Sequence, residues 1–229
     1  MAYGAYMLME NGQPFYTPQS TPIRLIGKYT QRSTIANAKA RATIEIPVDL
    51  TKPYVPVVVA MSDKNHPVVF STGVQAANQK ISVSGFSYQG NNTSNFTMEV
   101  YMFQNTPRAA ASGYGMALYD ESGKLFLTHE DRVLTDLESV GTRGSNNAGL
   151  YAKVTKNGKW GVVPAFAGWY IFQLGGGPGV VPISAGFGGF YNGSQTILAA
   201  HPLESPAGAG GGGGSTGVPM TIVNLANYD

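Results

Sequence analysis

The chain has three histidines, and only one of them has neighbours that could share a metal ion. His66 and His201 each precede a proline, whereas His129 is followed directly by Glu130 and Asp131. A metal site usually combines histidines at short spacing with a further carboxylate. A single His-Glu-Asp run after a predicted hairpin is more typical of a solvated turn. We therefore predict no metal site.

Nucleophilic chemistry has equally little support. The one Gly-x-Ser-x-Gly match, residues 213–217, lies inside a glycine run, whereas the serine of this motif belongs at a sharp strand-to-helix turn. The chain has no cysteine, and its glycine-rich segments lack the lysine of a phosphate-binding loop. A glycosidase needs two carboxylates across a groove, but Glu204 and Asp229 are the only acids after residue 159. We predict no catalytic residue, no cofactor and no enzymatic activity.

A run of basic residues between positions 24 and 41 has no intervening acid and includes Tyr29; its members are Arg24, Lys28, Arg32, Lys39 and Arg41. Such a stretch could contact phosphates of a nucleic acid. The formal net charge of the chain is only +2 at pH 7, however. A solvated strand edge, or a contact with an acidic subunit, explains the run better. We expect no nucleic-acid partner.

The remaining candidates are aromatic residues and glycines in the second half of the chain. Three interpretations are open for the aromatic residues: core positions, an interface with another protein, or stacking on sugar rings. A glycine segment permits close approach of another backbone. As candidate interface residues we take Trp160, Trp169, Tyr170, Phe187, Phe190, Tyr191, Gly211, Gly212 and Gly213.

Charge is distributed unevenly along the chain. Charged residues make up 12% of it, about half the usual quarter, and all fifteen basic residues lie at or before Lys159. A solvated surface normally carries charges of both signs. The stretch 160–229 therefore indicates a surface buried against other subunits, or a glycine-rich surface.

An internal repeat predicts how the elements are organised. Six residues recur at an offset of 111 positions: Tyr3, Gly4, Glu10, Gly12, Phe15 and Thr17 return as Tyr114, Gly115, Glu121, Gly123, Phe126 and Thr128. The offset is the length of a small domain. We predict a tandem duplication: a first repeat over 1–105, a linker over 106–113 and a second repeat over 114–229. Each repeat is expected to have its own core and to lie end to end with the other.

Short runs rich in Val, Ile, Tyr and Phe, bounded by Gly, Pro, Asn and Asp, predict strands throughout. In the first repeat these are 5–10, 14–17, 23–30, 42–46, 55–61, 68–72, 80–88 and 97–104; in the second they are 116–120, 125–128, 133–140, 150–155, 161–166, 170–174, 180–190 and 220–225. The turns at 10–13 and 121–124 fit tight hairpins. Eight short strands per repeat predict an all-β chain of two β-sandwiches.

The glycine-rich segment 208–217 falls within an insertion, 202–218, of the second repeat. One interpretation is a flexible loop. The other is an extended glycine strand that packs where chains meet at a symmetry axis.

The opening residues 1–10, with the turn 11–13 and the continuation to Gly27, resemble small tail-tip proteins of long-tailed, siphovirus-like bacteriophages. The pattern of about 25 residues returns over 114–128, although the stretch 134–141 is more acidic and longer than in that family. The resemblance implies a virion component of the distal tail or baseplate, without enzymatic activity, often in threefold surroundings.

From this resemblance we expect a structural protein, made in the host cytoplasm and located in the phage tail, that forms a homotrimer or binds hub, fibre or other tail-tip proteins. The alternative is an adhesin that contacts a receptor on the host surface. The sequence has no leader pattern and no apolar run long enough to cross a membrane, so we expect no membrane insertion.

Overall fold

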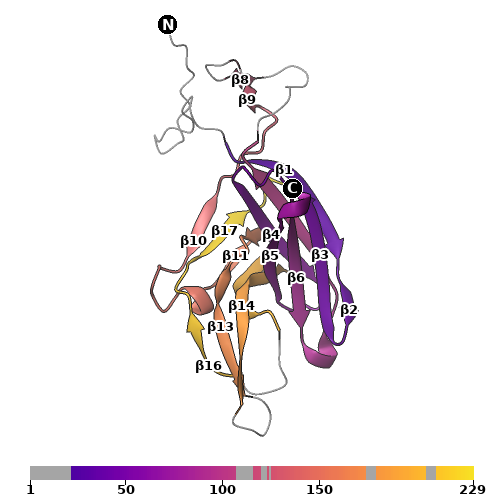
Figure 1. Cartoon of the computed structure of the whole chain (residues 1–229), viewed down its shortest axis with the longest axis vertical. Helices are drawn as coiled ribbons and strands as arrows, with labels where there is room; N and C mark the ends of the chain where they lie inside the picture. The colour runs from indigo at the N-terminus through magenta and orange to yellow at the C-terminus, as the bar shows by residue number, and fades with distance from the viewer. Residues whose placement is uncertain (1–21, 107–115, 120–122, 124, 174–178, 205–209) are drawn as a thin grey trace.

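A computed structural model describes residues 22–106, 116–119, 123, 125–173, 179–204 and 210–229. These residues form an all-β protein in which two large antiparallel sheets pack face to face (Figure 1). Three short 3₁₀ turns accompany them: η1 (Ala76–Asn78), η2 (Gly90–Asn92) and η3 (Gly149–Tyr151).

The first sheet has six strands in the order β1-β7-β4-β12-β17-β10. Their bounds are β1 Arg24–Arg32, β7 Phe96–Gln104, β4 Tyr54–Ser62, β12 Trp160–Val162, β17 Met220–Asn224 and β10 Leu137–Val140. Strands from both halves of the chain therefore share one sheet, and they meet where Val58 of β4 pairs with Val162 of β12.

The second sheet has nine strands, seven of them in the order β11-β15-β14-β5-β6-β3-β2, with β13 paired to β14 and β16 paired to β13. Their bounds are β11 Lys153–Asn157, β15 Gln195–Pro202, β14 Val180–Tyr191, β5 Val68–Gln75, β6 Lys80–Tyr88, β3 Lys39–Pro47, β2 Thr34–Ala36, β13 Phe166–Gln173 and β16 Gly210–Ser215. A separate hairpin joins β8 (Ala117–Tyr119) to β9 (Leu125–Thr128).

Alternation of side chains explains how these strands form the sandwich. In β3, Ala40, Ala42 and Ile46 are buried, whereas Arg41 and Glu45 are exposed. A strand with this period of two presents one face to the core and the other to solvent. The same alternation, carried across the sheet by the registers, defines an outer face of the nine-stranded sheet.

The two halves have the same order of strands. In the six-stranded sheet the first half supplies β1-β7-β4, and the second half continues the sheet with the counterparts of these strands in reverse order, β12-β17-β10. In the nine-stranded sheet β3-β6-β5 is continued by β14-β15-β11 in the same way. Strands β13 and β16 have no counterpart among the described strands of the first half.

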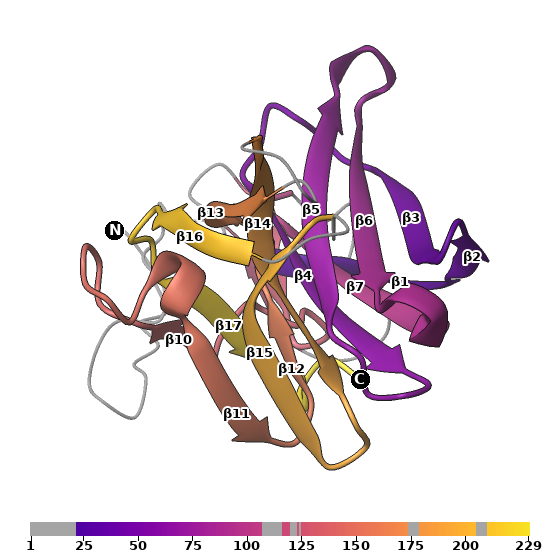
Figure 2. The same ribbon diagram turned by 90° about the horizontal axis from the view of Figure 1, so that it is seen from below.

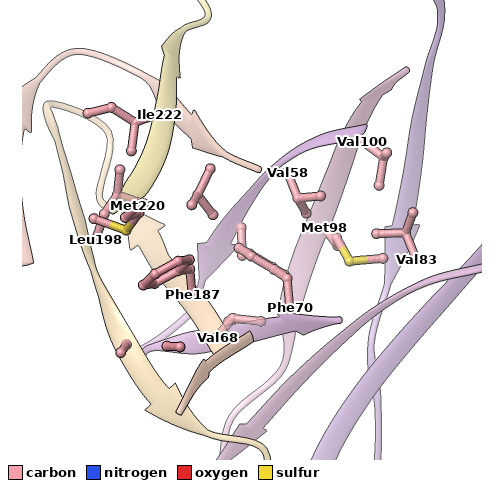
Figure 3. Packing of buried hydrophobic residues seen from close by; sticks show 14 of the residues in the cluster. Val58, Val68, Phe70, Val83, Met98, Val100, Phe187, Leu198, Met220 and Ile222 are labelled. Atoms are coloured by element: carbon pink, nitrogen blue, oxygen red, sulfur yellow. The ribbon is translucent and has the colours of Figure 1, made fainter. Parts of the chain in front are cut away.

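The main core is shared by both halves. Val58, Phe70 and Met98 of the first half belong to one buried cluster with Phe187 and Ile222 of the second (Figure 3). The expectation of two separate cores placed end to end is therefore wrong for the described residues, because β4 pairs with β12 and β5 with β14. The predicted domain boundaries stay a prediction.

The six predicted strands from 23–30 to 97–104 are confirmed as β1, β3, β4, β5, β6 and β7, whereas β2 was not predicted. The predicted strands 5–10 and 14–17, the turn 10–13 and all but the first residue of the linker 106–113 lie outside the described residues. In the second half β15 was not predicted, and Gly149–Tyr151 is a 3₁₀ turn rather than the start of a strand. Gly123, at the predicted second hairpin turn, has the positive φ of 78° that such a turn needs.

The glycine-rich segment is the largest difference. Gly210–Ser215 is an edge strand, β16, whose residues Gly213 and Gly214 pair with Tyr170 and Trp169 of β13 (Figure 2). Within the described range the segment is therefore extended, and the flexible-loop interpretation is wrong for it. Residues 205–209 lie outside the described part.

Candidate binding surface on the nine-stranded sheet

The outer face of the nine-stranded sheet has a strip without side chains where the two halves meet. Gly186 and Gly188 of β14 lie on this face, next to β5. A Cβ at Gly188 would lie 2.1 Å from the carbonyl oxygen of Val68, and one at Gly186 would lie 2.9 Å from that of Phe70. Only glycine fits such close strand contact. Two pockets, which adjoin at Leu203, open over this strip.

The first pocket has a volume of about 210 Å³. Its lining comes from both halves of the chain: Pro67, Val69, Phe86, Tyr88, Gln89, His201, Pro202 and Leu203. Phe86 and Val69 are cross-strand partners, which places them on the same face. The pocket thus combines aromatic and proline surfaces with an amide and an imidazole.

His201 is the notable polar group of this pocket. It is partly buried, and burial, followed by the nearby positive charge of Lys153, lowers the pKa of His201 to about 4. The imidazole is therefore neutral at pH 7, with one donor nitrogen and one acceptor nitrogen. Within the described part of the chain neither nitrogen has a hydrogen-bond partner.

The cations nearest to this pocket are already engaged. The Lys39 ammonium lies 4.8 Å from the centre of the Phe86 ring and 3.4 Å from Oε1 of Glu204. The Arg41 guanidinium lies 5.3 Å from the same ring. Both cations thus contact Phe86, and no charged residue is part of the pocket lining.

The second pocket has a volume of about 360 Å³ and lies where two strands diverge. β14 pairs with β15 along one edge and, along its other edge, first with β13 and then with β5 at Gly188 and Gly189. β13 and β5 separate from each other at this point. The lining of the pocket is Phe70, Ser71, Thr72, Pro164, Ala165, Phe166, Ser184, Ala185, Gly186 and Leu203.

An aromatic strip continues the surface beyond the second pocket. A bulge between Phe166 and Gly168 shifts the register of β13, so that Phe166 and Trp169 point to the same outer face. Phe166 is 50% exposed and Trp169 is 42% exposed. A Cβ at Gly214 of β16 would lie 2.1 Å from the indole of Trp169, which explains why a glycine lies beneath this ring.

The predicted interface residues divide into three groups. Trp160, Phe187 and Phe190 are at most 9% exposed, so the chain itself encloses most of each side chain; their role at an interface stays a prediction. Tyr170 and Tyr191 are partly buried, and the Tyr191 hydroxyl donates to the carbonyl oxygen of Gly193.

Trp169 is the predicted aromatic residue that the structure leaves exposed. Gly211, Gly212 and Gly213 lie in β16 next to it. Gly212 has a φ of 79°, where the register of β16 shifts against β13. Phe166, which is exposed beside Trp169, was not among the predicted residues.

The basic run is largely neutralised within the chain. Arg24 pairs with Asp131 at 2.9 Å, Lys28 with Asp229 at 2.6 Å and Arg32 with Asp63 at 2.5 Å. Lys39 pairs with Glu204. In the described part of the chain these cations therefore do not form a row free for phosphates.

A separate charged cluster lies on the outer face of the six-stranded sheet. Lys159 Nζ lies 2.6 Å from Glu99 and 2.9 Å from Asp229, and Lys28 contacts the same two carboxylates. The Tyr101 hydroxyl lies within hydrogen-bond distance of both Glu99 and Asp229, and its single proton can be donated to either carboxylate. Glu99 and Tyr101 are neighbours on one face of β7, whereas Lys28, Lys159 and Asp229 come from distant parts of the sequence that the fold brings to them.

The two lysines and the two carboxylates of this cluster stabilise one another's charged forms. Burial alone would raise the pKa of Glu99 and of Asp229, but hydrogen bonds and charges from the lysines and from Tyr101 outweigh it, so that both pKa values are lowered, that of Asp229 to about 2. Burial and the two carboxylates raise the pKa of Tyr101. Because every member has partners inside the cluster, we interpret it as a structural clasp.

The His129-Glu130-Asp131 run has a structural role as well. Asp131 accepts a hydrogen bond from the backbone N–H of Thr128 at 2.7 Å and pairs with Arg24. The described residues contain no group of three side chains suited to hold a metal ion. Among the same residues no helix is long and apolar enough to cross a membrane.

Comparison of the chain with protein-family models, with curated proteins and with solved structures gives no match.

Proposed function

We propose that this protein is a structural component of a bacteriophage tail tip or baseplate, and that it binds other tail proteins through the aromatic strip of β13. The observation that carries the proposal is the pair Phe166 and Trp169, both exposed on a sheet face in the stretch 160–229, which has no basic residue and only two acids. Exposed aromatic residues without nearby charges favour burial against a partner. The resemblance of residues 1–27 to tail-tip proteins supports the same location.

We further propose that the fold arose by duplication of one unit. The mirrored strand order of the two halves supports this, as does the recurrence of six residues at one offset. In this view β13 and β16 were added to the second copy alone. The aromatic strip would then be an acquired contact surface, and three chains around a hub would each present one.

The alternative is a receptor-binding adhesin. The two adjoining pockets on the same outer face favour it, because a surface that only supports assembly does not need pockets. The two functions predict different behaviour of the same variants. Loss of an assembly contact prevents incorporation of the chain into particles, whereas loss of an adhesin site leaves particles complete but impairs their attachment.

The test is incorporation of the double variant Phe166→Ser/Trp169→Ser into particles of the phage that encodes the chain. Antibody labelling should place the wild-type chain at the distal tail, and the double variant should be absent from particles. The matched control is Ile35→Ser, which changes a residue 46% exposed on β2. Circular dichroism of the purified chains checks that both variants fold.

Two results would refute the structural role. One is the absence of the wild-type chain from purified particles. The other is normal incorporation of the double variant, with attachment to host cells either unchanged or lost; loss of attachment alone would establish the adhesin alternative. Light scattering of the purified chain tests the expected trimer.

A further inference from the structure

We propose that the two adjoining pockets form a binding site for an uncharged saccharide chain, with one sugar ring in each pocket and Leu203 between them. The proposal goes beyond the structural role and does not depend on it, because it rests on the pockets alone. No residue of the aromatic strip other than Phe166 takes part in it.

The shape of the site fits small rings. Pockets for drug-sized ligands have volumes of roughly 300–1000 Å³, and the two pockets have about 210 and 360 Å³. The first volume lies below this range and the second near its lower end, so each pocket has room for a single sugar ring. Because both open on the same sheet face and share Leu203, a ligand of two linked rings can occupy them together.

The apolar part of the lining fits the faces of a sugar ring. A pyranose has C–H groups on its faces and hydroxyl groups at its edge, so proteins often hold it against the flat side of an aromatic residue. Phe86 and Tyr88 supply such surfaces in the first pocket and Phe166 in the second. The cation–π contacts of Lys39 and Arg41 help to hold the ring of Phe86 in place.

The polar part of the lining fits hydroxyl groups. Neutral His201 offers one donor and one acceptor, and the Gln89 amide offers both kinds of group. Ser71 and Ser184 add hydroxyls on the outer face at the second pocket. Within the described part of the chain, these side chains make no other hydrogen bond, so they are available to a ligand that both donates and accepts.

Three other ligand classes fit less well. An anionic ligand would need a free cation, but Lys39 already pairs with Glu204, and no charged side chain lines either pocket. A peptide that extends a sheet needs a strand edge, whereas the pockets lie over the face of β14. Hydrolysis of a glycan would need two facing carboxylates, and neither pocket is lined by one. We therefore infer binding without cleavage.

The experiment starts with the purified full chain on an array of neutral and acidic saccharides of one to six rings, including bacterial surface polysaccharides, with an array of peptides as the comparison. The best neutral saccharide is then titrated against the chain by NMR. We expect affinity to rise from one ring to two, because the second ring enters the second pocket.

Two variants and a control test the site itself. His201→Phe keeps a ring of similar size but removes both nitrogens, and should weaken binding about tenfold. Phe166→Ala should weaken binding roughly two- to tenfold and only for saccharides of two or more rings. Thr155→Ala changes an exposed residue of β11 outside both pockets and should leave binding unchanged.

Several results would overturn the proposal. These are the absence of binding to every neutral saccharide, binding that both variants leave unchanged, or selective binding of peptides. Binding restricted to acidic saccharides and abolished by salt would also overturn it, because it would place the ligand on the outer cations. Particle incorporation is measured separately, so failure here says nothing against the structural role.

Discussion

Replacement of His201 by glutamine should remove a large part of the acid sensitivity of this protein. The pKa of His201 in the folded chain is about 4, below the ordinary value of 6.5. Between these two pH values the unfolded chain binds a proton at this position and the folded chain does not. Stability therefore falls as pH falls from about 6.5, and the loss is complete near pH 4.

The magnitude follows from the width of that interval. Each pH unit over which one proton separates the two states changes the free energy of unfolding by about 1.4 kcal/mol. The interval between pH 6.5 and pH 4 thus corresponds to a loss of as much as about 3 kcal/mol. This is a substantial share of the roughly 5–15 kcal/mol that stabilises an ordinary domain.

The assay is urea unfolding of the wild-type chain and of His201→Gln at several pH values from 7 to 4. The lowered pKa values of Glu99, Asp131 and Asp229 affect stability mainly below this range and do so in both proteins. The difference between the two unfolding free energies therefore isolates His201. It should grow by about 3 kcal/mol in favour of the variant as pH falls to 4.

NMR titration of the folded chain gives an independent reading of the same group. The His201 ring signal should have its midpoint near pH 4. A midpoint near 6.5, or unfolding free energies of wild type and variant that fall in parallel, would refute the reasoning. A low midpoint also keeps the imidazole neutral, so that saccharide binding should not change between pH 7 and pH 5.5.

Three further substitutions test the clasp, the glycine strand and an exposed ion pair. Lys159→Met removes the cation shared by Glu99 and Asp229 and should cost about 3 kcal/mol in urea unfolding; a loss below about 1 kcal/mol would show that Lys28 compensates alone. Gly214→Val places a Cβ against the indole of Trp169, so it should cost roughly 1–3 kcal/mol and change the tryptophan fluorescence, and an unchanged spectrum would contradict the packing of β16. Lys156→Met breaks the exposed pair with Glu138 and should change stability by less than about 1 kcal/mol, so a larger loss would contradict its solvent exposure.

The strands of the first half could be predicted because their signals are local. β4 reads Tyr-Val-Pro-Val-Val-Val-Ala-Met-Ser, and β3 alternates small apolar with polar residues. β15 was missed because Gln195, Thr196 and His201 dilute its apolar pattern. β16 was missed because glycine has no strand preference of its own, and only pairing with β13 makes it extended.

The pockets could not be predicted, because their lining depends on register. Phe86 and His201 are 115 positions apart in the sequence, and they meet only because β14 pairs with both β5 and β15. The clasp around Tyr101 depends on register in the same way. A useful signal was present nevertheless: Gly186 and Gly188 alternate within a strand pattern, and such glycines indicate close contact with another backbone.

The asymmetry between the halves is the strongest argument that the outer face has a function. In the mirrored strand order, β5 and β14 are counterparts and meet at the centre of the sheet. Along one edge of β14, however, the first part of the strand pairs with β13, and only Gly188 and Gly189 pair with β5. This change of pairing partner opens the second pocket and also places Phe166 and Trp169 on the surface. Ala167 of β13 belongs to the main core, but the rings of Phe166 and Trp169 are exposed and are not part of it. We therefore expect deletion of the exposed aromatic rings to impair binding far more than folding.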